Sequence, residues 1–266
     1  MKQKTSESIF SIALTPNELY YLANLFGPGL VFGLEERSDN LDEKKIKDLA
    51  DEAYTSLSKV GLVKKSNNNQ ILIDELLSGM IYSCVHSNHV LIVKDVKSGK
   101  ERFFHFLPDW QLEFVFLNNK YELTLFRERA DLFQHICDVY NLNPTPNEEG
   151  LKFSINAEDL ELSIFLLENG KSDKATEIVK EKYPDFPEPE RFLIEYNKSI
   201  NDLRFDLIFD REDKEKVRTK TRRLVEISGT YYWITYSENN VSKEEELIFS
   251  PVTLDQAEWL FNQLLP

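Results

Sequence analysis

The side chains most able to carry out chemistry in this chain lie around two histidines that are separated by two residues. His86 and His89 fall at a predicted junction between a helix and a strand. With Cys84 or Asp95 as a further ligand, they could coordinate a metal ion such as zinc. The alternative, which we favour, is that both are partly exposed loop residues. No metal site and no cofactor is therefore predicted.

The two cysteines, Cys84 and Cys137, lie in apolar stretches and are predicted to be small core residues. A cysteine nucleophile needs a neighbouring base and a lowered pKa, and the sequence indicates neither. The glycines form no G-x-G-x-x-G or phosphate-loop motif, and no G-x-S-x-G motif is present. Among 46 acidic residues, the sequence singles out no acid–base pair. We therefore predict no catalytic residue and no enzyme.

The charge of the chain restricts the class of partner. A formal net charge of -14 argues against nucleic acid, because binding to phosphates needs a basic surface. It suits a basic or an apolar protein partner. The first ten residues lack the continuous apolar segment of a signal peptide, and no run of 18 apolar residues predicts a membrane span. We expect a cytoplasmic protein with no membrane span.

Residues 42–80 have the order of a winged helix, with a polar hairpin-like turn after two helices. A winged helix that reads DNA would carry several Lys or Arg on its second helix. Here the basic residues Lys44, Lys45 and Lys47 are interleaved with acidic ones. We therefore favour a packing role for this region over DNA binding.

Two distant segments resemble each other. Residues 10–27 (FSIALTPNELYYLANLFG) align without a gap with residues 153–170 (FSINAEDLELSIFLLENG), at an offset of 143. Phe, Ser, Ile, Glu, Leu and the final Gly match. Each segment predicts a strand followed by an amphipathic helix that ends at glycine. Because self-similarity of this kind indicates repeated structure, an internal duplication is predicted.

The predicted order of elements also occurs twice: a strand, helices, a four-stranded meander and a closing helix. Four strands are predicted in each half, at 89–96, 102–107, 111–116 and 121–126, and then at 204–209, 223–228, 231–236 and 246–249. The closing helices are predicted at 130–140 and 253–265. We therefore predict a single domain, 1–266, made of two related halves at 10–142 and 151–266, with a linker at 143–150.

Aromatic residues gather in both predicted meanders. Alternation along a strand sends about half of them to each face of a sheet. One interpretation is that both faces pack against helices. The other is that one face or its turns present aromatic anchors to a partner. The candidate partner-binding residues are Phe104, Phe106, Trp110, Tyr231 and Trp233.

Short motifs along almost the whole chain resemble one family. They are LTPNEL at 14–19, LSKVGL at 57–62, IDELL at 73–77, and GTYY at 229–232 followed by PVT at 251–253. The chain resembles the EspG-type chaperones of type VII (ESX) secretion systems and Firmicute proteins of similar layout. The resemblance implies an α+β fold with a quasi-two-fold duplicated architecture, in which a central antiparallel sheet is flanked by helical bundles. It also implies binding of the helical tip of a secreted protein through sheet loops and adjacent helices.

The resulting hypothesis is a non-enzymatic, cytosolic chaperone or adaptor that keeps a type VII secretion substrate soluble for export. The predicted partner is a helical secreted protein. The alternative is an acidic immunity protein that neutralises a cognate toxin by direct binding. The strong acidity of the chain would suit a basic toxin.

Overall fold

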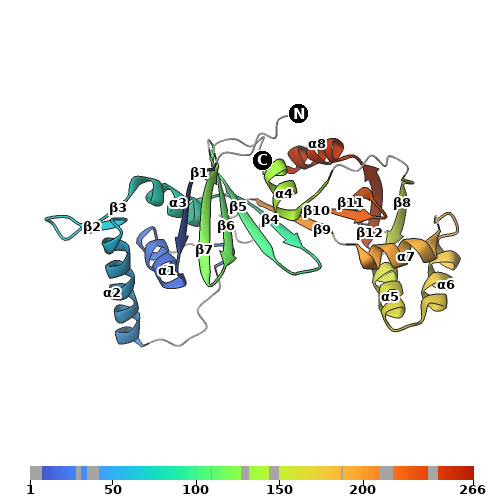
Figure 1. The fold of residues 1–266 in the computed structure, drawn as a ribbon, viewed down its shortest axis with the longest axis horizontal. Coiled ribbons are helices and arrows are strands. Elements are labelled where there is room, and N and C mark those ends of the chain that lie inside the picture. The colour runs from blue at the N-terminus through green and yellow to red at the C-terminus, as the bar shows by residue number, and fades with distance from the viewer. Residues whose placement is uncertain are drawn as a thin grey trace. The chain divides into compact units, whose positions relative to one another are not determined.

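The computed structural model describes residues 8–27, 31–34, 42–108, 110–126, 132–143, 150–186, 188–199, 201–209, 218–238 and 245–266. Antiparallel strands are flanked by helices, which confirms the predicted α+β class (Figure 1). The chain divides into two compact units, each of which draws on more than one segment. They are Met1–Val93, Glu101–Gln134 and Ile208–Arg218, and then Lys94–Lys100, His135–Leu207 and Thr219–Pro266.

The described part of the first unit contains five strands of the large sheet, a separate two-stranded hairpin and three helices. Its strands run in the order β1-β7-β6-β5-β4. They are β1 (Ser8–Leu14), β4 (His89–Asp95), β5 (Glu101–Phe106), β6 (Gln111–Leu117) and β7 (Lys120–Phe126). The helices are α1 (Pro16–Leu25), α2 (Glu43–Lys59) and α3 (Glu75–His86), and a small hairpin of β2 (Val63–Lys65) and β3 (Ile71–Ile73) joins the last two.

The second unit has the same strand order. Its strands follow β9-β10-β11-β12-β8. They are β8 (Phe153–Asn156), β9 (Asp202–Phe209), β10 (Arg218–Ile227), β11 (Thr230–Glu238) and β12 (Glu245–Val252). The helices are α5 (Ala157–Glu168), α6 (Ser172–Lys182), α7 (Pro189–Lys198) and α8 (Leu254–Leu264), and α4 (Leu132–Tyr140) contributes its residues from His135 onward. The first residues of the helix predicted at 130–140 lie outside the described part of the chain.

The two strand–helix segments occupy equivalent places in their units. Each first strand pairs antiparallel with the last strand of its meander, β1 with β7 and β8 with β12. The helix that follows each strand starts at a side-chain cap, Thr15 for α1 and Asn156 for α5. This arrangement agrees with the predicted repetition of element order. The duplication itself, the single domain and the boundaries 10–142 and 151–266 stay predictions, and most of the linker at 143–150 lies outside the described residues.

The ungapped alignment of the two segments is wrong along the helices. Counting from the caps, Thr15 corresponds to Asn156, so the structural register differs by two positions from the alignment. A shift of two keeps a strand residue on its face but turns a helix residue by about 200°. Leu19 is fully buried, whereas Leu162, its match in the alignment, is 47% exposed, and Leu160 is buried instead. Relative to the alignment, α5 begins two residues earlier than α1, but it is also two residues longer, with 12 residues against 10. The closing glycines therefore still match.

Candidate partner-binding surface

The five aromatic candidates from the sequence are mostly core residues. Phe104, Phe106, Tyr231 and Trp233 are each at most 5% exposed, and Trp110 is half-buried against the core of the first unit. The Tyr231 hydroxyl accepts a hydrogen bond from the Asn143 amide at 3.1 Å. The Trp233 ring stacks on Phe205 with centroids 5.8 Å apart. Four of the five therefore have little surface to offer in the free chain, and contact of any of them with a partner stays a prediction.

The candidate metal ligands are used in other ways. His86 donates from Nε2 to the Phe26 carbonyl at 3.1 Å, and Cys84 is fully buried. The Asp95 carboxylate accepts from the Lys97 and Ser98 amides and fixes a turn. Among the described residues, no group of three or more His, Cys, Asp or Glu could hold a metal ion.

The second unit presents an outward surface along α7. One side of this helix is anchored by Phe192, Leu193 and Tyr196, which are buried in the core of the unit. Phe192 packs edge-on against Phe153 and Phe249 at centroid distances of 4.9 and 5.6 Å. Burial of this side holds the helix in place and leaves its other side facing away from the core.

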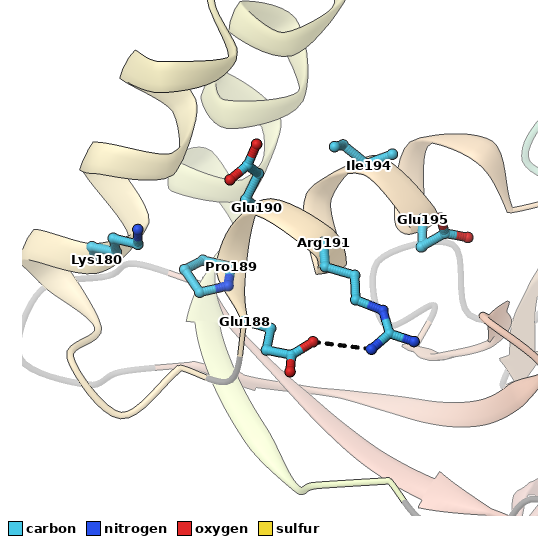
Figure 2. A pocket seen from close by; sticks show the side chains of 7 residues that line it. All are labelled: Lys180, Glu188, Pro189, Glu190, Arg191, Ile194 and Glu195. Atoms are coloured by element: carbon cyan, nitrogen blue, oxygen red, sulfur yellow. Dashed lines mark hydrogen bonds and ion pairs between the residues drawn. The ribbon is translucent and has the colours of Figure 1, made fainter.

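A pocket of about 470 Å³ lies on that outward side (Figure 2). Pro189 and Ile194 are its apolar residues, and Lys180 reaches it from α6. The remaining lining residues are charged: Glu188, Glu190, Arg191 and Glu195. Glu188 and Arg191 form an exposed ion pair at 3.1 Å, which contributes little to stability because both side chains are 70% exposed. The pocket can therefore seat a small apolar group within a charged rim that carries three glutamates, one lysine and one arginine.

The turn between β4 and β5 lies against the other end of α7. Lys97 donates from Nζ to the Asn197 carbonyl at 3.1 Å, and the Val96 amide donates to the Asp202 carbonyl at 2.9 Å. A cation beside the last carbonyls of a helix interacts favourably with the helix dipole. These contacts join a sheet loop to an adjacent helix, and Val96 remains 38% exposed there.

A buried ion pair fixes α7 to the sheet of the second unit. Arg223 donates to both oxygens of the Asp202 carboxylate, at 3.1 and 2.5 Å, and to the Tyr196 hydroxyl at 2.9 Å. Burial raises the pKa of Tyr196 to about 12, against the opposing effect of the Arg223 guanidinium. Tyr196 therefore stays protonated at neutral pH. Because Tyr196 belongs to α7 and Arg223 to β10, the network fixes the helix to the sheet.

A second apolar feature lies on α5, which packs against α6 and α7. Leu162 is 47% exposed and Phe165 is 59% exposed, and a spacing of three residues places them on one face. Three exposed glutamates accompany this pair: Glu158, Glu161 and Glu168. The pair has the composition of a small docking site for an apolar side chain with basic neighbours.

Sequence reasoning missed both features for different reasons. The α7 surface carries no motif, and only its fold brings Lys180 and the turn at Lys97 next to the helix. The α5 pair was visible in principle. Once Asn156 is recognised as the cap, helical periodicity places Leu160 and Ser163 inward and Leu162 and Phe165 outward.

Comparison with known proteins gives one informative result. No protein-family model matches the chain, and no curated protein matches it. Among solved structures, it is similar to the Mycobacterium tuberculosis type VII secretion system chaperone EspG5, solved in complex with a PE25–PPE41 dimer. The TM-score is 0.64 at 10% sequence identity, over 97% of both chains. None of the described helices is long and apolar enough to cross a membrane. The likeness shows the fold alone: the chain has an EspG-like fold.

Proposed function

We propose that this protein is a cytosolic chaperone or adaptor that binds a helical segment of a type VII secretion substrate and keeps that substrate soluble. The observation that carries the proposal is the fold match to EspG5 over 97% of both chains. A match of that extent includes both units. EspG5 was solved in complex with a PE25–PPE41 dimer. Together with the helical tip that the sequence resemblance implies, this complex leads us to propose a helical secreted protein as the partner. The part of the resemblance that concerns Firmicute proteins stays a prediction.

The α7 surface, defined as the pocket at Pro189–Glu195 with the turn at Lys97, is our proposed binding site. Its pocket accepts an apolar side chain, and Glu190 and Glu195 favour a positive group beside it, since Arg191 already offsets the charge of Glu188. The end of a helical hairpin would fit, because it exposes apolar side chains, and the positive N-terminal end of a helix dipole favours acidic neighbours. The α5 pair of Leu162 and Phe165 would extend the contact on the same group of helices.

No covalent chemistry is required for such a role. The contribution of the chain would be burial of an apolar tip, which prevents aggregation, together with charge complementarity, which sets partner choice. We propose a non-enzymatic activity on this basis. The acidic immunity protein is not carried forward, because no observation favours it.

Co-purification with matched variants tests the proposed site. The tagged chain would be expressed in cells that make a type VII secretion system, and captured proteins would be identified by intact mass. We expect a helical secreted protein with the wild type, and at least a tenfold lower yield with Ile194→Asp or Phe165→Asp, because a buried unpaired charge is unfavourable. Trp259→Asp on α8 is the control, since Trp259 is 63% exposed and lies outside the proposed site. Equal capture by all variants would reject the site, and absence of any secreted helical protein would reject the function.

A further inference from the structure

The pocket on α7 combines an apolar wall with charges of both signs. Pro189 and Ile194 form the apolar part, Lys180 and Arg191 supply two cations, and three glutamates complete the rim (Figure 2). Its volume of about 470 Å³ falls within the range of roughly 300–1,000 Å³ that is typical of pockets for small ligands. The pocket therefore has room for a flat ring system.

An aliphatic side chain would match only part of this lining. It would gain from contact with Pro189 and Ile194. It would also displace water from the charged groups around it, and it offers those groups no partner in return. The mixed charge of the rim therefore disfavours a purely aliphatic occupant.

An aromatic ring would match both parts of the lining. The face of such a ring is electrically negative and its edge is positive. A ring that rests on Pro189 and Ile194 can turn its face to a cation, here Arg191 or Lys180, and its edge to a carboxylate. A rim that carries both signs of charge is thus complementary to an aromatic group.

The guanidinium of Arg191 is suited to stacking on such a ring. Its Nη1 atom donates to Glu188 at 3.1 Å, and the side chain is 70% exposed. All N–H groups of a guanidinium point outward in its own plane, so this ion pair engages one edge and does not use the flat faces. An aromatic ring can therefore stack on Arg191 while the ion pair stays intact.

The backbone at Glu188 also indicates a binding role for this segment. Glu188 precedes α7 with φ 39° and ψ 60°, in the left-handed region that residues other than glycine rarely adopt. It makes no side-chain hydrogen bond to the start of the helix, and its carboxylate pairs with Arg191 instead. Strained residues of this kind concentrate at functional sites. Here the strain accompanies a carboxylate that faces the pocket.

We propose that the α7 pocket binds an aromatic side chain that carries a hydrogen-bond donor, tryptophan or tyrosine, with its ring stacked on the Arg191 guanidinium. The indole N–H or the phenol O–H would donate to Glu190 or Glu195, because a carboxylate is a strong acceptor. This inference rests on the proposed function, since it names the group by which the α7 surface would hold the partner.

A titration with two small neutral probes tests the preference without the partner. N-acetyltryptophanamide and N-acetylleucinamide would be added to the full chain, labelled with ¹⁵N, and followed by NMR. We expect the tryptophan probe to bind with a dissociation constant on the order of 1–10 mM and at least fivefold more tightly than the leucine probe. The Arg191 Nε–H proton should shift upfield, because a proton above the face of an aromatic ring is shielded.

A matched pair of arginine variants tests the stacking. Arg191→Gln should weaken binding of the tryptophan probe by about twofold to fivefold, the loss expected for one exposed cation–π contact. Arg204→Gln is the control, because Arg204 is also a partly exposed, ion-paired arginine and lies outside the pocket, and it should bind as the wild type does.

The outcomes separate this inference from the proposed function. Equal binding of the two probes, no shift at Arg191, or an Arg191→Gln variant that binds as well as Arg204→Gln would overturn the aromatic assignment, even if a helical secreted protein is captured. Selective binding of the tryptophan probe would support the assignment even if no secreted protein is captured, and in that case only the proposed function would fail.

Discussion

At the scale of single residues, the sequence placed the two cysteines correctly but did not indicate the buried ion pair of the second unit. The expectation that Cys84 and Cys137 are core residues is confirmed, since both are buried. Burial raises the pKa of the Cys137 thiol to about 12, so it is not a nucleophile at neutral pH. The Asp202–Arg223 pair was not foreseen, because 21 positions separate the two residues and only the sheet brings them together.

Loss of the Asp202 carboxylate should strongly destabilise the second unit. Asp202→Ala would leave the Arg223 guanidinium, which is 14% exposed, without its counter-ion. The expected loss is about 3–5 kcal/mol in the free energy of unfolding, measured by urea denaturation. The control is Arg204→Ala, which breaks the more exposed pair with Asp206 and should cost about 0–1 kcal/mol. A loss for Asp202→Ala no larger than that of the control would contradict this role for the pair.

At the scale of elements, local chemistry made some boundaries predictable. The segment LTPNEL has the signature of a helix start, a threonine followed three residues later by a glutamate, and the structure contains the full capping box. The Glu18 amide donates to Thr15 Oγ1 at 3.3 Å, and Glu18 Oε2 accepts from the Thr15 amide at 2.8 Å. The ungapped alignment maps the cap of α1 two residues beyond the cap of α5 at Asn156, because it follows sequence identities rather than helix caps. Helical periodicity alone would have given the correct register.

Removal of either cap should weaken its own helix by a similar amount. Asn156 Oδ1 accepts from the Glu158 and Asp159 amides at 2.8 and 3.4 Å, as Thr15 does at α1. Thr15→Ala and Asn156→Ala are each expected to lower the free energy of unfolding by about 1 kcal/mol. Ser154→Ala, two positions before the second cap, should change it by less than about 0.5 kcal/mol. If the cap variants matched the Ser154 control in denaturant titrations, the assignment of the two helix starts would be wrong.

At the scale of the whole molecule, the predictions came mostly from the composition and from the order of the secondary-structure elements. Two runs of strands among helices sufficed for the α+β class, and the acidity argued against nucleic acid. The sequence could not predict which aromatic residues face outward, since that depends on which helices cover each sheet. Phe104 and Trp233 are buried for this reason, while the surface we propose for binding lies on α7, which has no motif.

The central claim is that the chain keeps a helical secreted partner in solution through the α7 surface. The most direct measurement is the fraction of that partner that remains in the supernatant after ultracentrifugation, alone and with an equimolar amount of the chain. We expect the partner to sediment alone, to remain soluble with the wild type or with Trp259→Asp, and to sediment with Ile194→Asp. A partner that is equally soluble without the chain, or that Ile194→Asp protects as well as the wild type, would contradict the account.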